Sequence, residues 1–308
     1  MRKVRRAAAI YFMLQGLAVA LWWLLLFTTP SSRKYFVLEG NSETSLMALW
    51  LADLVFLAAG SLAACWLVFR NSKYAPAALW LVAGAMSYAA FYCLAFAWVT
   101  DTGWLGVLLM LPAMIWSGVF AVTLSPTVEL MFRQAVVSST GWILAKTYAQ
   151  IIVAWSIILV IFPYLITIIE DKLSIPRFHF QFQEPLAAVL FASISFLGIM
   201  SAHTMARIGQ GTPLPLDSSN KLVVRGTYSY VRNPMAISGI GQGLMVALWF
   251  GSPLVALYAL MGSLIWQIVF RPIEEDDLVE KFGADYEDYR EHVRCWIPNI
   301  RSYRAGAG

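Results

Sequence analysis

The stretch AAAIYFMLQGLAVALWWLLLF runs from Ala7 to Phe27 without a charged residue. An apolar segment of about 20 residues is long enough to cross the hydrocarbon core of a bilayer as an α-helix. A secretory signal peptide also begins with basic residues, as Met1–Arg6 does, but its apolar core spans only about 7–15 residues. We therefore predict an uncleaved first membrane-spanning helix.

Further apolar segments follow, and together they predict an all-α polytopic transmembrane helix bundle of about eight spans. The composition agrees, because 59% of the residues are hydrophobic and 13% are charged, whereas soluble domains carry about 25% charged residues. The last two segments are short and are separated by Gly251-Ser252-Pro253, which predicts a tight helical hairpin. The segments after the first are Leu46–Phe69, Ala77–Val99, Trp104–Leu124, Tyr148–Ile169, Pro185–Met205, Met235–Phe250 and Pro253–Phe270.

The distribution of Lys and Arg predicts the orientation of these spans. With the N-terminus placed in the cytoplasm, 18 of the 22 Lys and Arg residues lie on the cytoplasmic side. Cytoplasmic loops of membrane proteins carry such an excess. We therefore expect a multi-pass protein of the bacterial plasma membrane, with both termini cytoplasmic, with the lipid bilayer as a partner and with no nucleic-acid partner. The other four Lys and Arg residues, which this arrangement places outside, are Arg33, Lys34, Lys172 and Arg177.

Two cytoplasmic segments, Arg207–Pro234 and Arg271–Gly308, flank the short hairpin and should meet at one membrane face. The first contains GQGTPLPLD from Gly209 and KLVVRGTYSYVRNP from Lys221. Its glycines and prolines exclude a continuous helix between Gly209 and Gly226. The composition fits either a structured cofactor loop or an ordered surface connection. Asn233-Pro234 then predicts a helix start with Asn as the cap.

The second segment opens with RPIEEDD, from Arg271 to Asp277. Four consecutive acids suit the positive end of a helix, and this purely structural interpretation competes with a role for Glu274 and Glu275 in binding a cationic ligand. The residues that follow predict amphipathic helices lying on the bilayer surface.

Three other features were weighed. Ser125–Lys146 predicts an interfacial helix. Asp53, inside the second span, is interpreted either as a functional group or as a hydrogen-bonding partner of a neighbouring helix. The three cysteines lack the spacing of metal ligands, so we expect no metal site.

From about His203 to Pro298, the chain resembles the isoprenylcysteine carboxyl methyltransferase superfamily of integral membrane methyltransferases. Phosphatidylethanolamine N-methyltransferases are more distant relatives. The resemblance implies that S-adenosylmethionine binds at the cytoplasmic membrane face. Three ordered blocks carry it: Gly209–Pro213 with Leu222–Gly226; Gly226–Pro234; and Arg271-x-x-x-Glu-Glu275, followed by Phe282-Gly283, Tyr286-x-x-Tyr289 and Ile297-Pro298.

The resemblance also implies roles for individual residues. It implies catalytic roles for Arg271 and Glu275. The sequence departs from the family pattern at three positions: Asn233 replaces a common His, Ala236 replaces Tyr, and Ser238 replaces Gly, with Gly239 displaced by one. The implied cofactor-binding residues are Gly226, Tyr228, Arg232, Asn233, Pro234, Gly239, Glu274 and Glu275.

Residues 1–140 are then expected to be transmembrane helices of unknown role, and residues 141–308 a membrane methyltransferase module. The expected reaction moves the methyl group of S-adenosylmethionine to a lipid-like or membrane-embedded carboxylate, thiolate or amine. One alternative is an NADPH-dependent membrane reductase of the steroid 5α-reductase type, and another is a non-catalytic membrane protein built on a decayed module. The paired Glu274 and Glu275 favour a sulfonium ligand over a pyrophosphate, which would prefer Arg and Lys. The sequence indicates no oligomeric state.

Overall fold

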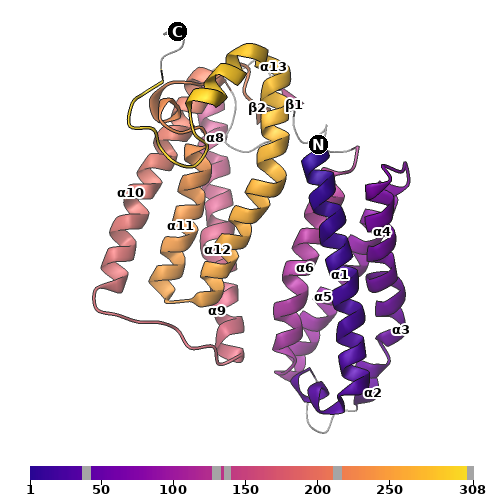
Figure 1. The fold of residues 1–308 in the computed structure, drawn as a ribbon. Helices are drawn as coiled ribbons and strands as arrows, with labels where there is room; N and C mark the ends of the chain where they lie inside the picture. Colours follow the sequence, from indigo (N-terminus) through magenta and orange to yellow (C-terminus); the bar gives the residue numbers. More distant parts are fainter. Residues whose placement is uncertain (37–42, 127–132, 135–139, 211–216, 304–308) are drawn as a thin grey trace. The chain divides into compact units, whose positions relative to one another are not determined.

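The computed structural model of the chain describes residues 1–36, 43–126, 133–134, 140–210 and 217–303 (Figure 1). The chain forms two compact units, Met1–Val128 and Glu129–Gly308. The regular secondary structure of the described residues is helical apart from two short parallel strands, β1 (Arg133–Gln134) and β2 (Asp217–Ser218). The predicted class, an all-α helix bundle, is therefore confirmed.

The N-terminal unit consists of long helices in which α1 packs against α4, and α5 against α6. The close approach of α1 to η2 and α4 needs a glycine, because a Cβ on Gly16 would lie 2.9 Å from the carbonyl oxygen of Ala58 in η2 and 2.9 Å from Cγ of Leu62 in α4. The elements are α1 (Arg2–Thr28), η1 (Pro30–Tyr35), α2 (Glu43–Met47), α3 (Trp50–Ala52), the π-helical turn η2 (Asp53–Ala59), α4 (Gly60–Phe69), α5 (Ala75–Thr100) and α6 (Trp104–Thr123).

A buried polar cluster joins three of these helices. Gln15 of α1 donates to the hydroxyl of Ser61 on α4 at 3.0 Å, and Ser117 of α6 donates to the Gln15 carbonyl oxygen at 3.0 Å. Tyr11 also donates to Gln15 and to the backbone of Ala113. Polar side chains among apolar helices are costly unless they are paired, so this cluster fixes how α1, α4 and α6 pack.

The C-terminal unit contains four long helical stretches. Its α8, η3 and α9 run on as one helix, as do α10 with η4, and α12 with η6 and α13. Half of the predicted interfacial helix, Ser125–Lys146, lies outside the described residues; within it, Arg133–Gln134 forms the strand β1, and α8 begins at Thr140. The elements are α8 (Thr140–Trp155), η3 (Ser156–Ile161), α9 (Phe162–Lys172), α10 (Gln183–Thr204), η4 (Met205–Gly209), η5 (Gly226–Ser229), α11 (Pro234–Phe250), α12 (Pro253–Ile265), η6 (Trp266–Phe270) and α13 (Arg271–His292).

Seven helical stretches in the described part of the chain are long and apolar enough to cross a membrane. The shorter apolar helix Pro234–Phe250 corresponds to the seventh predicted segment. The second span begins at Trp50 and not at Leu46, because two turn residues separate α2 from α3. These helices make the chain a multi-pass membrane protein.

The predicted hairpin between α11 and α12 is confirmed, and its tip is tied to neighbouring segments. Gly251 has a positive φ of 62°, and a Cβ there would lie 2.0 Å from the carbonyl oxygen of Phe178. Ser252 caps α12 by accepting from the backbone of Val255, and it donates to the buried carboxylate of Glu170 at 2.7 Å. This tip holds α11 and α12 in register, so that their other ends bring the chain before α11 and the chain after α12 to the same end of the unit (Figure 1).

One prediction for this region was wrong. The acids after Arg271 do not open a helix, because the backbone is already helical through Trp266–Phe270. Pro272 cannot donate a backbone hydrogen bond, and the π-helical turn of η6 directly before it accommodates this loss. The acids therefore lie inside a continuous helix, which bends only at Gly283, where φ is 49° and ψ is −125°. The helix dipole alone does not account for them.

Candidate active site

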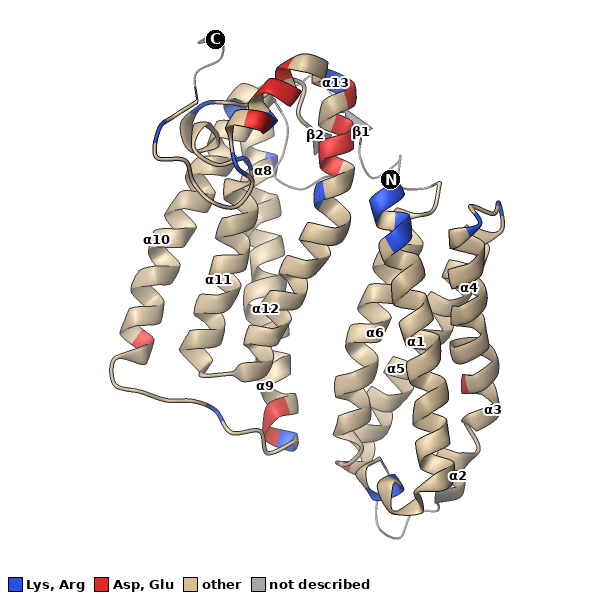
Figure 2. Ribbon diagram, in the orientation of Figure 1, with Lys and Arg blue, Asp and Glu red and all other residues tan. Residues whose placement is uncertain are grey.

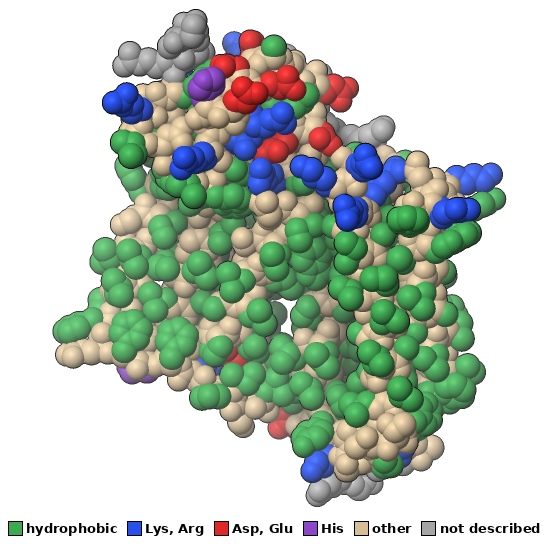
Figure 3. Space-filling view, viewed as in Figure 1, with side chains coloured by type: hydrophobic (Ala, Val, Ile, Leu, Met, Phe, Trp, Pro, Cys, Tyr) green, Lys and Arg blue, Asp and Glu red, His purple; other side chains and the backbone are tan. Residues whose placement is uncertain are grey.

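Charged side chains of the C-terminal unit gather at one end, over α13 and the chain that follows it (Figures 2 and 3). The apolar lengths of α10, α11 and α12 lead away from this end. Such clustering is expected where membrane helices enter water. The residues implied by the family resemblance can therefore be tested against the contacts at this end.

The centre of the cluster is the carboxylate of Glu275, which joins two of the predicted blocks. The same oxygen of Glu275 accepts from Arg232 Nη1 at 2.9 Å and from Arg271 Nε at 2.9 Å. The side chains of Glu275 and Arg232 are only 20% and 10% exposed. One negative charge thus lies between two positive charges in a mostly buried setting, where hydrogen bonds between charged groups are strong.

Aromatic and backbone contacts hold the Arg232 segment against α13. Tyr286 lies 3.3 Å from Arg232 Nη1, and Tyr289 donates to the carbonyl oxygen of Tyr228 at 2.6 Å. The backbone of Arg232 donates to the carbonyl oxygen of Arg294 at 3.0 Å. Tyr286 and Tyr289 are both almost fully buried. The second and third blocks are therefore one packed structure.

Two groups at this site lack partners among the described residues. The hydroxyl of Tyr228 is buried without a hydrogen bond, and no hydrogen bond or ion pair joins half-buried Glu274 to another described residue. Burial, with the charges of Glu275 and Asp277, raises the pKa of Glu274 from 4.5 to about 7. Burial and the charge of Glu274 raise the pKa of Tyr228 well above 10. Buried polar groups of proteins are normally satisfied, so this pair suits a polar or cationic ligand.

The remaining predicted residues lie at three kinds of position. Gly226 has a positive φ of 62°, which a glycine tolerates best, and it starts the turn η5. Pro234 is buried at the first position of α11, as predicted. Gly239 is exposed, and a Cβ there would meet no atom within 4 Å, so helix packing does not require this glycine.

The role predicted for Asn233 as a helix cap was wrong. Asn233 occupies the position before α11, but its side chain makes no capping hydrogen bond. Its amide lies 3.5 Å from the sulfur of Cys295 and turns toward the C-terminal block. The tertiary contact competes with the local cap, and Pro234 already removes one backbone N–H that would need a cap.

The sequence interpretation missed several residues that support this cluster. Gln267 accepts from Arg271 at 3.0 Å and from the indole of Trp296 at 2.7 Å. The available signal was its position one helical turn before Arg271. Ser238, one of the departures from the family pattern, donates to the carbonyl oxygen of Ile194 at 2.7 Å and so faces α10.

The geometry can now be set beside known proteins. Residues 183–285 match the family model described as phospholipid methyltransferase. This part of the C-terminal unit is therefore similar to that family. The resemblance to the isoprenylcysteine carboxyl methyltransferase superfamily is thereby confirmed, because the phospholipid methyltransferase domain belongs to that wider group. The matched range covers α10 to Asp285 in α13 and includes Arg232, Arg271 and Glu275.

Two curated proteins match part of the chain. A methanethiol S-methyltransferase from Pseudomonas deceptionensis is 27% identical over 118 residues, which are 38% of this chain and 41% of that protein. A methanethiol S-methyltransferase 2 from Bradyrhizobium diazoefficiens is 32% identical over 80 residues, or 25% of this chain and 29% of that protein. The chain thus matches less than half of the length of either relative. The matches indicate a membrane methyltransferase domain.

Proposed function

We propose that the protein transfers the methyl group of S-adenosylmethionine to a hydrophobic acceptor that reaches the site from the bilayer. The observation that carries the proposal is the cluster of Arg232, Glu275 and Arg271 beside the unpartnered Glu274 and Tyr228. It lies within the matched methyltransferase domain, at the end of apolar helices.

The chemistry of the side chains fits this methyl donor. The carboxylate of Glu274 would hold a cationic group, and the hydroxyl of Tyr228 would gain the hydrogen bond that it lacks. Arg232 or Arg271 would pair with a carboxylate of the ligand. Glu275 positions both arginines and keeps their charges from being buried unpaired.

When bound, S-adenosylmethionine supplies a methyl group on a sulfonium, which an acceptor lone pair attacks while the C–S bond breaks to leave a neutral thioether. The protein's own contribution is to orient the reactants and to exclude water. Well-oriented reactants account for roughly 7–11 kcal/mol of barrier reduction in comparable cases. A carboxylate or thiolate acceptor needs no further base, and the related proteins carry the name of a thiol methyltransferase. We therefore place lipophilic thiols first among candidate acceptors, followed by carboxylic acids and amines.

A methyl-transfer assay tests the proposal. Purified protein in neutral detergent is incubated with S-adenosylmethionine tritiated on the methyl group and with an alkyl thiol, a fatty acid or an alkyl amine of equal chain length. We expect label in the organic extract with at least one acceptor, and its loss in Glu275→Gln but not in Glu280→Gln, a change at an exposed position of the same helix. Equal labelling by both variants would contradict the assigned site, and no labelling of any acceptor by a protein that binds the donor would contradict the acceptor class.

A further inference from the structure

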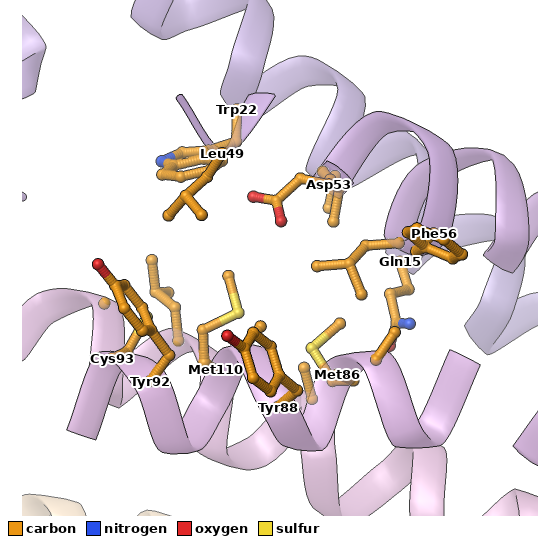
Figure 4. Close-up of a pocket in the computed structure, with 18 of the residues that line it drawn as sticks. Gln15, Trp22, Leu49, Asp53, Phe56, Met86, Tyr88, Tyr92, Cys93 and Met110 are labelled. Carbon is orange, nitrogen blue, oxygen red and sulfur yellow. The ribbon is translucent and has the colours of Figure 1, made fainter. Parts of the chain in front are cut away.

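The N-terminal unit contains a cavity of about 1090 Å³ that the methyltransferase domain does not explain (Figure 4). Its walls come from α1, from the segment leading through α3 into η2, from α5 and from α6. Most of the lining is apolar or aromatic, including Leu49, Phe56, Met86 and Met110. A cavity of this size is large enough for a drug-sized or lipid-sized molecule.

Asp53 is the charged group among the described residues that line this cavity. Its Oδ2 accepts from the indole of Trp23 at 3.1 Å, and no other hydrogen bond or ion pair joins the Asp53 carboxylate to a described residue. Figure 4 shows its carboxylate directed into the open space between Trp22 and Phe56. The residues that line the cavity include no Lys, Arg or His. The hydrogen bond from Trp23 confirms the structural interpretation of Asp53, but it leaves the other oxygen facing the cavity.

Besides Asp53, the cavity wall holds a polar group that has no partner among the described residues. The indole N–H of Trp22 is buried and meets no acceptor among the described residues. The rings of Trp22, Tyr88 and Tyr92 also line the cavity around Asp53. Aromatic faces attract cations, and this attraction grows when the cation is removed from water. Electrostatics therefore favour a positive head group and disfavour a phosphate or a carboxylate.

We propose that this cavity binds an amphiphilic amine without an acidic group. Its ammonium pairs with Asp53, its hydrocarbon chain lies along the apolar walls, and an oxygen beside the amine can accept from Trp22. An uncharged alcohol would leave the carboxylate unpaired, and a fatty acid would place two negative charges together. The site gives the N-terminal unit a binding role that is separate from methyl transfer.

Binding of three tritiated probes to the full-length protein in neutral detergent tests the charge requirement. The probes are dodecylamine, dodecanol and dodecanoate, which share a chain length, and binding is measured by scintillation proximity. We expect saturable binding of dodecylamine, and affinities for the other two that are lower by about tenfold or more, as for loss of a charge-assisted contact. Asp53→Asn should reduce dodecylamine affinity to a similar degree. Asp101→Asn, at an exposed position of the same unit, should not.

A second pair of variants tests the location without changing any charge. A Cβ on Gly84, which lines the cavity, would meet no atom within 4 Å, and the same is true of Gly118, which does not line it. Gly84→Leu should place a side chain inside the cavity and weaken saturable amine binding, while Gly118→Leu should leave it intact. Dodecanol binding as tight as dodecylamine binding, an unchanged affinity in Asp53→Asn, or full amine binding by Gly84→Leu would each overturn the proposal. If Asp53→Asn does not fold, the three probes still test the charge requirement, and the two glycine variants still test the location of the binding site.

Discussion

Glu275 connects residues that lie about 40 positions apart in the chain, because it accepts from both Arg232 and Arg271. Removing one member of such a cluster leaves the others partly buried without full compensation. The Glu275 side chain is 20% exposed, which moderates the cost through solvent screening. Arg271 keeps its contact with Gln267, and Arg232 keeps Tyr286.

We therefore expect Glu275→Gln to fold but to lose roughly 1–3 kcal/mol of stability, in line with the loss of charge-assisted hydrogen bonds. The affinity for S-adenosylhomocysteine should fall by about tenfold or more, since the arginines lose their positioning partner. Thermal unfolding and calorimetric titration measure the two effects, with Glu280→Gln as the control. An unchanged affinity for S-adenosylhomocysteine would mean that Glu275 has only a structural role.

The raised pKa of Glu274 predicts how stability and cofactor affinity depend on pH. Its pKa is about 7 in the folded protein, against 4.5 for the ordinary group. The folded state therefore binds more protons between pH 4.5 and 7, so the contribution of this group to stability is full below pH 4.5 and is lost as the pH rises through 7. A cationic ligand favours the ionised carboxylate and should release a proton when it binds. We expect affinity for S-adenosylmethionine to rise between pH 6 and 8.

Calorimetry in two buffers of different ionisation enthalpy measures this proton release directly. Glu274→Gln should abolish both the release and the rise in affinity, and it should stabilise the ligand-free protein at pH 8. An equally steep pH dependence in Glu274→Gln would show that another group titrates.

At the scale of helices, the contact between α10 and α11 depends on one glycine. A Cβ on Gly198 would lie 2.3 Å from the hydroxyl oxygen of Ser238 and 3.1 Å from its Cβ. Ser238 is buried and donates to Ile194, so it has little freedom to move. Small residues at helix contacts in membranes allow this close packing.

We expect Gly198→Ala to lower stability by about 1–3 kcal/mol, which is typical of overpacking. The double variant with Ser238→Gly should lose less than the sum of the two single variants, because the clash is absent. Thermal unfolding of the four proteins gives the coupling. Additive losses would mean that the two helices do not approach as closely as the structure shows.

The helices themselves were predictable because their signals are local. Trp104 begins α6 as predicted, directly after Gly103, which has a positive φ. Gly251 and Pro253 mark the hairpin by their covalent structure. Glycine has no Cβ and so permits the positive φ of Gly251, and the ring of Pro253 fixes φ at the start of α12. Contacts between distant segments were harder. The pairing of β1 with β2 and the turn of Asn233 toward Cys295 depend on tertiary packing, which no local pattern encodes.

In the candidate site, too, individual residues were predictable from the sequence, whereas contacts between distant segments were not. Arg232, Arg271 and Glu275 were predicted, and the structure places both arginines within hydrogen-bonding distance of the Glu275 carboxylate. The supporting roles of Gln267 and Cys295 were missed, because an uncharged side chain at the end of an apolar helix carries no signal until its partner is known. The cofactor-binding role of Gly239 stays a prediction.

At the scale of the whole molecule, the distribution of charge predicts the orientation in the membrane. Reporter fusions placed after Phe27 and after Gly308 should report opposite sides, because an odd number of the eight predicted spans separates the two points. Reporters on the same side would reject the eight-span arrangement. Such a result would also question whether Pro234–Phe250 crosses the bilayer as predicted.

The central claim is that the C-terminal unit binds a methyl donor and not a nicotinamide cofactor. The most direct measurement is thermal unfolding of the full-length protein with S-adenosylhomocysteine, and separately with NADPH, at rising concentrations. A ligand that binds only the folded state stabilises it by about 2.7 kcal/mol at 100 times its Kd. We expect a saturable rise in Tm with S-adenosylhomocysteine that Glu275→Gln reduces, and no rise with NADPH. A rise with NADPH alone, or no rise with either ligand, would contradict the account.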